Sequence, residues 1–170
     1  MIRLARRGDL PAVLDIYNEA IVNTTAIYDY RPHTLADREA WYDQKLAAGL
    51  PLYVFEENGV VIGYATYGPF RTFPAYKYTV EHSVYVHKDH RGRKIGARLL
   101  QTLIETLNEK GYATLIGGID ADNAGSCRMH EKMGFRQVGE ITRAGYKFGR
   151  WLNLRFYQYD LVGPAMPTEE

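Results

Sequence analysis

TVEHSVYVH, residues 79–87, is followed at once by KDHRGRKIG, residues 88–96, and then by ARLLQTLIETLNEKG, residues 97–111. The first segment is rich in β-branched and aromatic residues, which favours a strand. From Ile95 onward, apolar residues recur at helical spacing until Gly111, a residue typical of helix ends. The three segments therefore predict a strand, a turn rich in glycine and cations, and an amphipathic helix.

The turn between that strand and that helix has the features of an anion site. The first amides of a helix lack acceptors within the helix and carry the positive end of its dipole. Gly92 and Gly96 allow the backbone to approach a ligand closely, and the cations nearby are Arg91, Arg93, Lys94 and Arg98. On these residues alone, a bound phosphate and a solvated basic helix start explain the composition equally well.

The segment from Arg91 to Ala97 resembles the Arg/Gln-x-x-Gly-x-Gly/Ala loop by which the GNAT superfamily of N-acetyltransferases binds the pyrophosphate of acetyl-CoA. Asn123 and residues 133–135 match the next motif of that superfamily, and Lys94 stands where the family usually has glycine. The resemblance extends from residue 2 to residue 161. Within the superfamily, three segments look like the branch of phosphinothricin and methionine sulfoximine acetyltransferases: 80–86, 128–131 and 147–151.

The resemblance implies an α/β (α+β) protein with the GNAT acyl-CoA N-acyltransferase fold. That fold is a mixed, mostly antiparallel sheet of about seven strands flanked by about four helices, with a parallel pair at the cofactor cleft. The residue patterns predict strands at 2–5, 52–56, 60–67, 79–87, 113–119, 135–142 and 154–161, and helices at 9–21, 34–48, 95–111 and 123–133.

The connections between these elements add three expectations. A helix of crossover length joins the strands at 79–87 and 113–119, so this pair is expected to be parallel. Residues 68–76, rich in proline and aromatic side chains, are expected to form an irregular pocket wall. Residues 1–163 are expected to form a single domain, with a C-terminal tail at 164–170.

Composition and charge exclude several classes of function. Lys and Arg number 21 against 20 Asp and Glu, a net charge of +1, so no global field attracts nucleic acid or membrane. The single cysteine, Cys127, excludes an internal disulfide and suits a reducing compartment. No apolar run approaches the roughly 20 residues of a membrane span, and the N-terminus lacks a signal peptide's apolar core. A cytoplasmic protein is therefore expected.

Glu81 is the candidate general base. It lies on the polar row of the 79–87 strand and is expected to act through a water on the acceptor amine. An α-amino group with a pKa near 7.7–8.0 is already roughly a tenth neutral at pH 7, so an amino-acid acceptor demands little of a base. Without the resemblance, Glu81 reads as an ordinary strand carboxylate facing solvent.

His130 is the candidate general acid. Superfamily members often place a tyrosine at this position, seven residues after the asparagine, to protonate the departing CoA thiolate, and a histidine can donate at neutral pH. The alternative is a helix histidine that is hydrogen-bonded for structure. The catalytic interpretation predicts that His130→Ala lowers turnover more than the affinity for acetyl-CoA, whereas equal losses would make it a binding residue.

The expected co-substrate is acetyl-CoA. The resemblance implies that its pyrophosphate contacts the loop of Arg91, Gly92, Arg93, Lys94, Ile95, Gly96 and Ala97. Backbone groups of Val84, Tyr85 and Val86 are expected to meet the pantetheine arm as an added strand would, and an amide near Val84 to hold the thioester oxygen. Asn123 is expected to cap its helix, to contact the cofactor arm, or to do both. Lys132 is expected to contact either the nucleotide phosphate or an exposed carboxylate of the protein.

The expected acceptor is a small amino acid or analogue, such as methionine sulfone, methionine sulfoximine or phosphinothricin, acetylated directly on its α-amine. Arg71 is the first choice to hold its carboxylate, because a guanidinium offers a matching pair of donors. Phe73 and Tyr76 are expected to enclose the acceptor side chain beside Glu81. The pair Arg150 and Trp151 is expected to close the site, although aromatic side chains in such loops also serve packing alone.

The sequence also contains features of other kinds of site. No metal site is predicted, because His82 and His87 should point to opposite faces of their strand. Cys127 fits a small buried hydrophobe better than a nucleophile. Two rival functions stay open: acetylation of a protein N-terminus or polyamine, and a non-catalytic acyl-CoA sensor on the same fold. The aromatic last strands favour a homodimer, by resemblance.

Overall fold

The computed structural model describes residues 1–170. Its seven strands are β1 (Ile2–Leu4), β2 (Leu52–Glu57), β3 (Val60–Pro69), β4 (Thr79–Val86), β5 (Thr114–Asp120), β6 (Arg136–Lys147) and β7 (Arg150–Asp160). Its four α-helices are α1 (Leu10–Asn23), α2 (Leu35–Ala47), α3 (Ile95–Glu109) and α4 (Ala124–Lys132). The predicted numbers of strands and helices are confirmed.

The strands form one mixed sheet in the order β1-β2-β3-β4-β5-β7-β6. β4 and β5 are parallel, with Glu81 opposite Ile116, whereas β1–β2, β2–β3, β5–β7 and β6–β7 are antiparallel. The predicted parallel pair is confirmed. It arises because α3 provides the crossover that two parallel neighbours require.

The contacts of the chain divide it into two compact units. The first comprises Met1–Tyr67 and Ser83–Leu103, and the second comprises Gly68–His82 and Ile104–Glu170. β4 and α3 each begin in one unit and end in the other. The expectation of a single domain at 1–163 stays a prediction.

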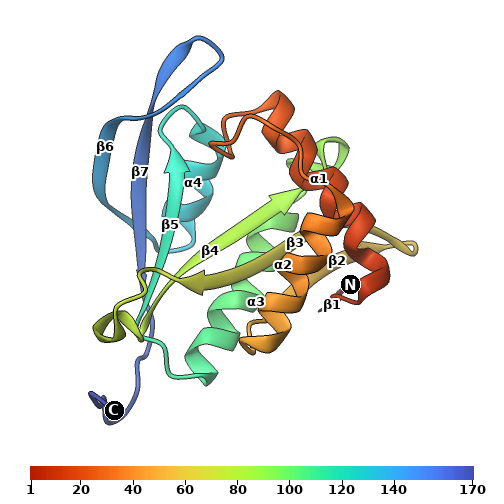
Figure 1. Cartoon of the computed structure of the whole chain (residues 1–170). Helices are drawn as coiled ribbons and strands as arrows, with labels where there is room; N and C mark the ends of the chain where they lie inside the picture. Colours follow the sequence, from red (N-terminus) through yellow and green to blue (C-terminus); the bar gives the residue numbers. More distant parts are fainter. The chain divides into compact units, whose positions relative to one another are not determined.

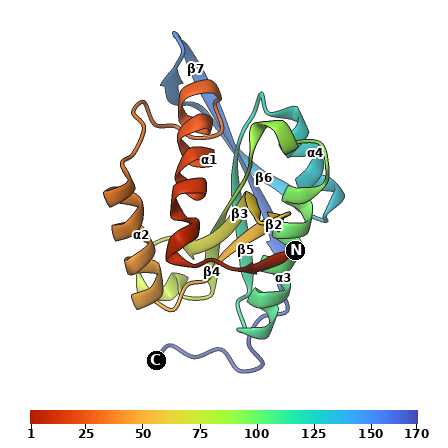
Figure 2. The ribbon, with the colours of Figure 1, turned by 90° about the vertical axis from the view of Figure 1, so that its right-hand side faces the viewer.

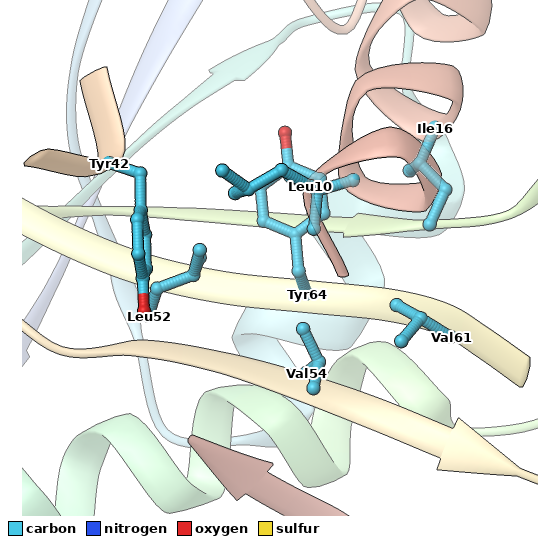
Figure 3. Packing of buried hydrophobic residues seen from close by; sticks show 8 residues of the cluster. Leu10, Ile16, Tyr42, Leu52, Val54, Val61 and Tyr64 are labelled. Carbon is cyan, nitrogen blue, oxygen red and sulfur yellow. The ribbon is translucent and has the colours of Figure 1, made fainter. Parts of the chain in front are cut away.

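The core of the first unit lies between its strands and two helices. α1 and α2 lie on one side of β2 and β3, and α3 lies on the other (Figure 2). Figure 3 shows the apolar side chains that meet on the α1 and α2 side, a cluster made of Leu10, Val13, Ile16, Tyr42, Leu52, Val54, Val61 and Tyr64. On the α3 side, Gly63 leaves room for Ile95 and Leu99, whose side chains lie 3.2 Å from where its Cβ would be.

The second unit is built around the hairpin of β6 and β7, which extends beyond the end of β5 (Figure 1). Both strands are longer than the predicted segments 135–142 and 154–161. The turn at Phe148 and Gly149 takes positive φ angles of 51° and 73°, as a tight hairpin requires. Residues 143–147 and 150–153 lack a strand-like apolar alternation, so only their place in the paired hairpin reveals that they belong to strands.

In the first unit, the structure confirms the predicted hairpin turn and the predicted cap of the second helix. Asn58 and Gly59, the predicted hairpin turn, have φ angles of 51° and 77°. The Thr34 side chain accepts a hydrogen bond from the Asp37 amide and caps α2. In the second unit, the segment expected to be irregular is partly ordered, because β3 continues to Pro69 and Pro74–Tyr76 form a short 3₁₀ turn.

Candidate active site

Glu81 lies on β4, and its carboxylate lies near Gly118 of the neighbouring strand β5. Its side chain is half-buried, and burial raises the pKa of its carboxyl group, against the opposing charge of Arg71. A Cβ at the exposed Gly118 would lie 3.8 Å from Glu81 Oε2, 3.5 Å from Leu154 Cδ1 and 3.9 Å from Phe156 Cε1. Gly118 therefore presents bare, exposed backbone beside a carboxylate and two apolar groups, while the raised pKa makes that carboxylate a better base.

The irregular segment brings a cation and aromatic rings to the same unit as Glu81. Arg71 is exposed, donates from Nη1 to the Phe70 carbonyl at 2.8 Å, and lies 4.1 Å from the centroid of the Phe70 ring. The Phe70 ring is 6.1 Å from Tyr76 and 6.3 Å from Phe156. Phe73 is 73% exposed. Arg71 and Tyr76 are thus positioned by Phe70, and Phe73 is held by no comparable packing.

His130 is buried on α4 and both of its ring nitrogens are engaged. Nδ1 lies 2.7 Å from the Ser126 carbonyl oxygen, and Nε2 lies 3.0 Å from Nε2 of His82. A carbonyl only accepts, so Nδ1 of a neutral His130 carries the proton and donates it. It follows that His82 donates through Nε2 to His130. Nδ1 of His82 is then an acceptor that is buried without a partner.

Burial keeps this histidine pair neutral. It lowers the pKa of His82 to about 3, and the charge of a protonated His130 would lower it further. Burial also lowers the pKa of His130, and this outweighs the hydrogen bond to the Ser126 carbonyl, which raises it. A neutral His130 held in this way has no free N–H to offer a thiolate. The geometry therefore favours the structural alternative for His130, and its role as an acid stays a prediction.

This pair makes the free energy of unfolding depend on pH. Unfolded histidines bind protons near pH 6.5, whereas folded His82 does so near pH 3. Between these values the unfolded state binds more protons, so stability falls as the pH is lowered. From pH 7 to pH 5 the loss of stability expected from His82 is about 2 kcal/mol.

Urea unfolding at several pH values measures this loss. His82→Leu should flatten the dependence and His33→Gln should not; an unchanged slope in His82→Leu would contradict this origin.

The backbone of the basic turn is left-handed at two positions and strained at one of them, Lys94. Gly92 has a φ of 78° and Lys94 a φ of 61°, and the Lys94 carbonyl accepts from the Arg98 amide in the first turn of α3. The left-handed conformation at Lys94 gives a physical reason for the glycine that the family usually has there. The helix amides that follow remain directed out of the turn, where an anion can take them.

We expect Lys94→Gly to stabilise the protein. A side chain in the left-handed region costs about 1–2 kcal/mol, of which the greater flexibility of unfolded glycine cancels a part. The free energy of unfolding should therefore rise by up to about 1 kcal/mol in urea titrations. Lys94→Ala removes the charge and keeps the strained Cβ, so it should change stability by less than about 0.5 kcal/mol. Equal gains in both variants would locate the effect in the charge instead.

The arginines of the turn are paired with carboxylates of the first unit. Arg91 contacts Glu19 at 2.6 Å, and Arg93 contacts Glu57 at 2.8 Å through a two-point ion pair. Arg91 Nε also donates to the Val86 carbonyl at 3.3 Å. Exposed ion pairs contribute about 0–1 kcal/mol, so a phosphate can displace these carboxylates at little cost.

The remaining predicted cofactor residues lie on β4 and α4. Val84, Tyr85 and Val86 are half-buried, and the Tyr85 ring packs 5.4 Å from Tyr64. Asn123 caps α4, because its side chain accepts from the Ser126 amide at 3.2 Å. Lys132 is exposed on the last turn of the same helix. The cap is confirmed, whereas contacts of these residues with a cofactor stay predictions.

Other predicted residues have local partners. Arg150 pairs with Asp122 at 2.6 Å, and Trp151, 56% exposed, contacts Tyr146 at 5.1 Å between ring centroids. Cys127 is buried, in keeping with its interpretation as a small hydrophobe. No three His, Cys, Asp or Glu side chains come together as ligands of a metal ion. None of the helices is both long and apolar enough to cross a membrane.

Sequence reasoning missed the residues that surround Glu81 and His130. The sequence pattern presents His82 only as a candidate metal ligand, although it is the hydrogen-bond partner of His130. Gly117 and Gly118 fall within the strand predicted at 113–119. Two consecutive glycines within a strand are unusual, because glycine weakens strands, and they often mark a close approach of another group. In β5 they mark both faces: Gly117 lies against the histidine pair and Gly118 lies beside Glu81.

The chain matches known acetyltransferases along most of its length. Residues 11–135 match the model of the Acetyltransferase (GNAT) family. The L-methionine sulfoximine/L-methionine sulfone acetyltransferase of Salmonella typhimurium is 43% identical over 166 residues, which are 98% of this chain and 97% of the relative.

Two solved structures are similar in both fold and sequence. A Salmonella typhimurium protein in complex with its cofactor acetyl-CoA has a TM-score of 0.95 and 43% identity, covering 99% of this chain and 97% of that one. A ribosomal-protein-alanine N-acetyltransferase of Brucella melitensis has a TM-score of 0.93 and 45% identity, covering 95% of this chain and 99% of that one.

Proposed function

Because the chain belongs to the GNAT family of acetyltransferases, we propose that it transfers the acetyl group of acetyl-CoA to the α-amine of a small amino acid. Methionine sulfone and methionine sulfoximine are the expected acceptors, by similarity to the Salmonella relative. One observation carries the proposal: the half-buried Glu81 carboxylate, whose pKa is raised by burial, lies beside the exposed backbone of Gly118.

Several groups of the chain have the chemistry to hold acetyl-CoA, which supplies the activated acetyl thioester. The amides and cations between Arg91 and Ala97 suit its pyrophosphate, because two left-handed residues expose the start of α3. The backbone of Val84 to Val86 suits its pantetheine arm, and an amide near Val84 suits the thioester oxygen. Asn123 and Lys132 on α4 are expected to contribute polar contacts.

Glu81 takes, through a water, the proton that the acceptor ammonium loses to become a neutral amine, a role that contributes typically 10²–10⁴ in rate. The amine nitrogen then forms the new C–N bond as the C–S bond of the thioester breaks, and CoA leaves with the electron pair on sulfur. The second proton, which the nitrogen loses as the amide forms, passes through solvent to that sulfur and gives the free thiol. A thiol has a pKa near 8.5, so the departing sulfur needs only mild assistance from an acid near neutral pH. The neutral, engaged state of His130 is compatible with that low demand.

Arg71 and its aromatic neighbours are expected to select the acceptor. The exposed guanidinium of Arg71 is available for a carboxylate on the same side as Glu81, whose pKa it already influences. Leu154 and Phe156 line the space at Gly118, and Tyr76 and Phe73 belong to the segment beside it. An acceptor with a carboxylate, a nearby amine and an unbranched, partly polar side chain fits this arrangement.

An acceptor screen tests the function. The protein is incubated with acetyl-CoA and each of methionine sulfone, methionine sulfoximine, phosphinothricin, an alanine-initiated peptide and spermidine, and free thiol is followed. We expect turnover with the amino acids. Turnover on the peptide alone would instead support the second candidate, acetylation of a protein N-terminus, which the similarity to the Brucella enzyme favours. Tight binding of acetyl-CoA with no turnover on any amine would indicate a sensor.

We also expect a cytoplasmic homodimer. Five large apolar side chains of the β6–β7 hairpin and its turn are about half exposed or more: Val138, Ile141, Tyr146, Phe148 and Trp151. Exposed apolar side chains gathered on one hairpin are typical of a surface that a second copy covers. Light scattering measures the mass, and a monomer at micromolar concentration would contradict the expectation. The free Cys127 thiol suits the reducing cytoplasm.

A further inference from the structure

Arg38 is a buried cation without an ionic partner. It projects from α2 with only 3% of its surface exposed. Its Cζ lies 4.0 Å from the centroid of the Tyr17 ring and 4.4 Å from that of Trp41. No ion pair of the protein includes Arg38, and its Nε is buried without a hydrogen-bond partner. Arginine is almost never buried in this way unless it is paired.

The two aromatic rings satisfy this guanidinium only in part. A ring attracts the charge, but the five N–H donors of a guanidinium lie in its plane and need oxygen acceptors. The carboxylate of the adjacent Asp37 is committed elsewhere, since it accepts from the Thr34 amide and hydroxyl at 2.8 Å. Lys45, also near Trp41, adds a second cation rather than an anion.

The hydroxyl of Tyr64 is a second unsatisfied group, and Tyr64 belongs to the apolar cluster against which Tyr17 and Trp41 pack. Tyr64 is 1% exposed, and its hydroxyl oxygen has no hydrogen-bond partner. Figure 3 shows this oxygen on the side of the ring away from Val54. Burial raises the pKa of the Tyr64 hydroxyl, with an opposing effect from the charge of Arg38, so the two groups lie within electrostatic reach. At neutral pH this hydroxyl therefore keeps its proton and can donate it.

We propose that Arg38 and Tyr64 bind a small carboxylate anion. A planar carboxylate can accept from the guanidinium edge at two points and from the phenol at one. A single negative charge matches the single buried positive charge, whereas a phosphate dianion would leave an excess charge in a cluster of aromatic rings. The low exposure of Arg38 restricts the site to an anion of few heavy atoms. Formate is the smallest probe of this class.

Thermal unfolding of the full-length protein tests the site. Sodium chloride is replaced stepwise by sodium formate at constant ionic strength, and Tm is measured. We expect Tm to rise and to saturate, because a ligand that binds only the folded state stabilises it. Tyr64→Phe should fold normally, since it removes only an unsatisfied hydroxyl, and should weaken formate binding about tenfold or more. Arg38→Gln should abolish the response.

Tyr42→Phe is the matched control. Tyr42 belongs to the same apolar cluster, but its hydroxyl already donates to the Ala5 carbonyl at 3.0 Å. This variant should lose stability and keep the formate response. The proposal is overturned if formate and chloride give the same Tm, if Tyr64→Phe responds as the wild type does, or if crystals grown in formate hold only water at Arg38. None of these measurements depends on acetyltransferase activity.

Discussion

Replacement of Glu81 by glutamine is expected to lower kcat with methionine sulfone by about 10²–10⁴-fold. Glutamine keeps the size of the side chain and its place between Gly118 and Arg71, but it cannot take a proton from the acceptor amine. The wild-type rate should also fall at acid pH as Glu81, with its raised pKa, becomes protonated. The variant should lose this acid limb of the profile.

Steady-state kinetics at several pH values and binding of acetyl-CoA by calorimetry check this result. Affinity for acetyl-CoA should be unchanged, because Glu81 is not among the groups assigned to the cofactor. Glu109→Gln is the control, since Glu109 is exposed at the end of α3. A variant at Glu81 that retains full turnover would remove it from the chemistry and leave an ordinary strand carboxylate.

Gly117→Ala is expected to be the most destabilising of the single-methyl changes in β5. Its Cβ would lie 2.7 Å from Nε2 of His82 and 3.3 Å from Nε2 of His130. These rings are stacked at 5.1 Å and packed edge-on against Phe135, so neither can move aside freely. Overpacking of this kind costs about 1–3 kcal/mol. Each 1 kcal/mol corresponds to about 2–4 °C in Tm for a chain of this size.

The adjacent Gly118→Ala provides the comparison. Its Cβ would meet its nearest neighbours at 3.5–3.9 Å, which is ordinary contact, so Tm should change little. The same methyl group enters the space beside Glu81, so KM for the acceptor should rise while binding of acetyl-CoA stays the same. Differential scanning calorimetry of both variants measures the contrast. Equal losses of stability would mean that the histidine pair does not restrict Gly117.

The order of the elements could be predicted from the sequence because the signals are local. Apolar periodicity, the Thr34 cap and the Asn58-Gly59 turn each act over a few residues. The parallel β4–β5 pair followed from the length of the crossover. The full length of β6 and β7 could not be predicted, since residues 143–147 and 150–153 join the strands only because the two strands pair with each other.

The sequence could identify candidate residues of the site but not the contacts between them. Glu81 could be chosen because its strand pattern and the family resemblance coincide. The protonation state of His130 could not be predicted, because it depends on His82, 48 positions away, and on the space left by Gly117. Arg38 reads in sequence as a normal surface residue of a helix, and only tertiary packing buries it between Tyr17 and Trp41.

A crystal structure with bound acetyl-CoA and methionine sulfone locates both substrates relative to Glu81. We expect the pyrophosphate on the amides between Gly92 and Ala97, and the acceptor amine within one water of the Glu81 carboxylate. A pyrophosphate bound elsewhere, or an acceptor amine remote from Glu81, would contradict this expectation.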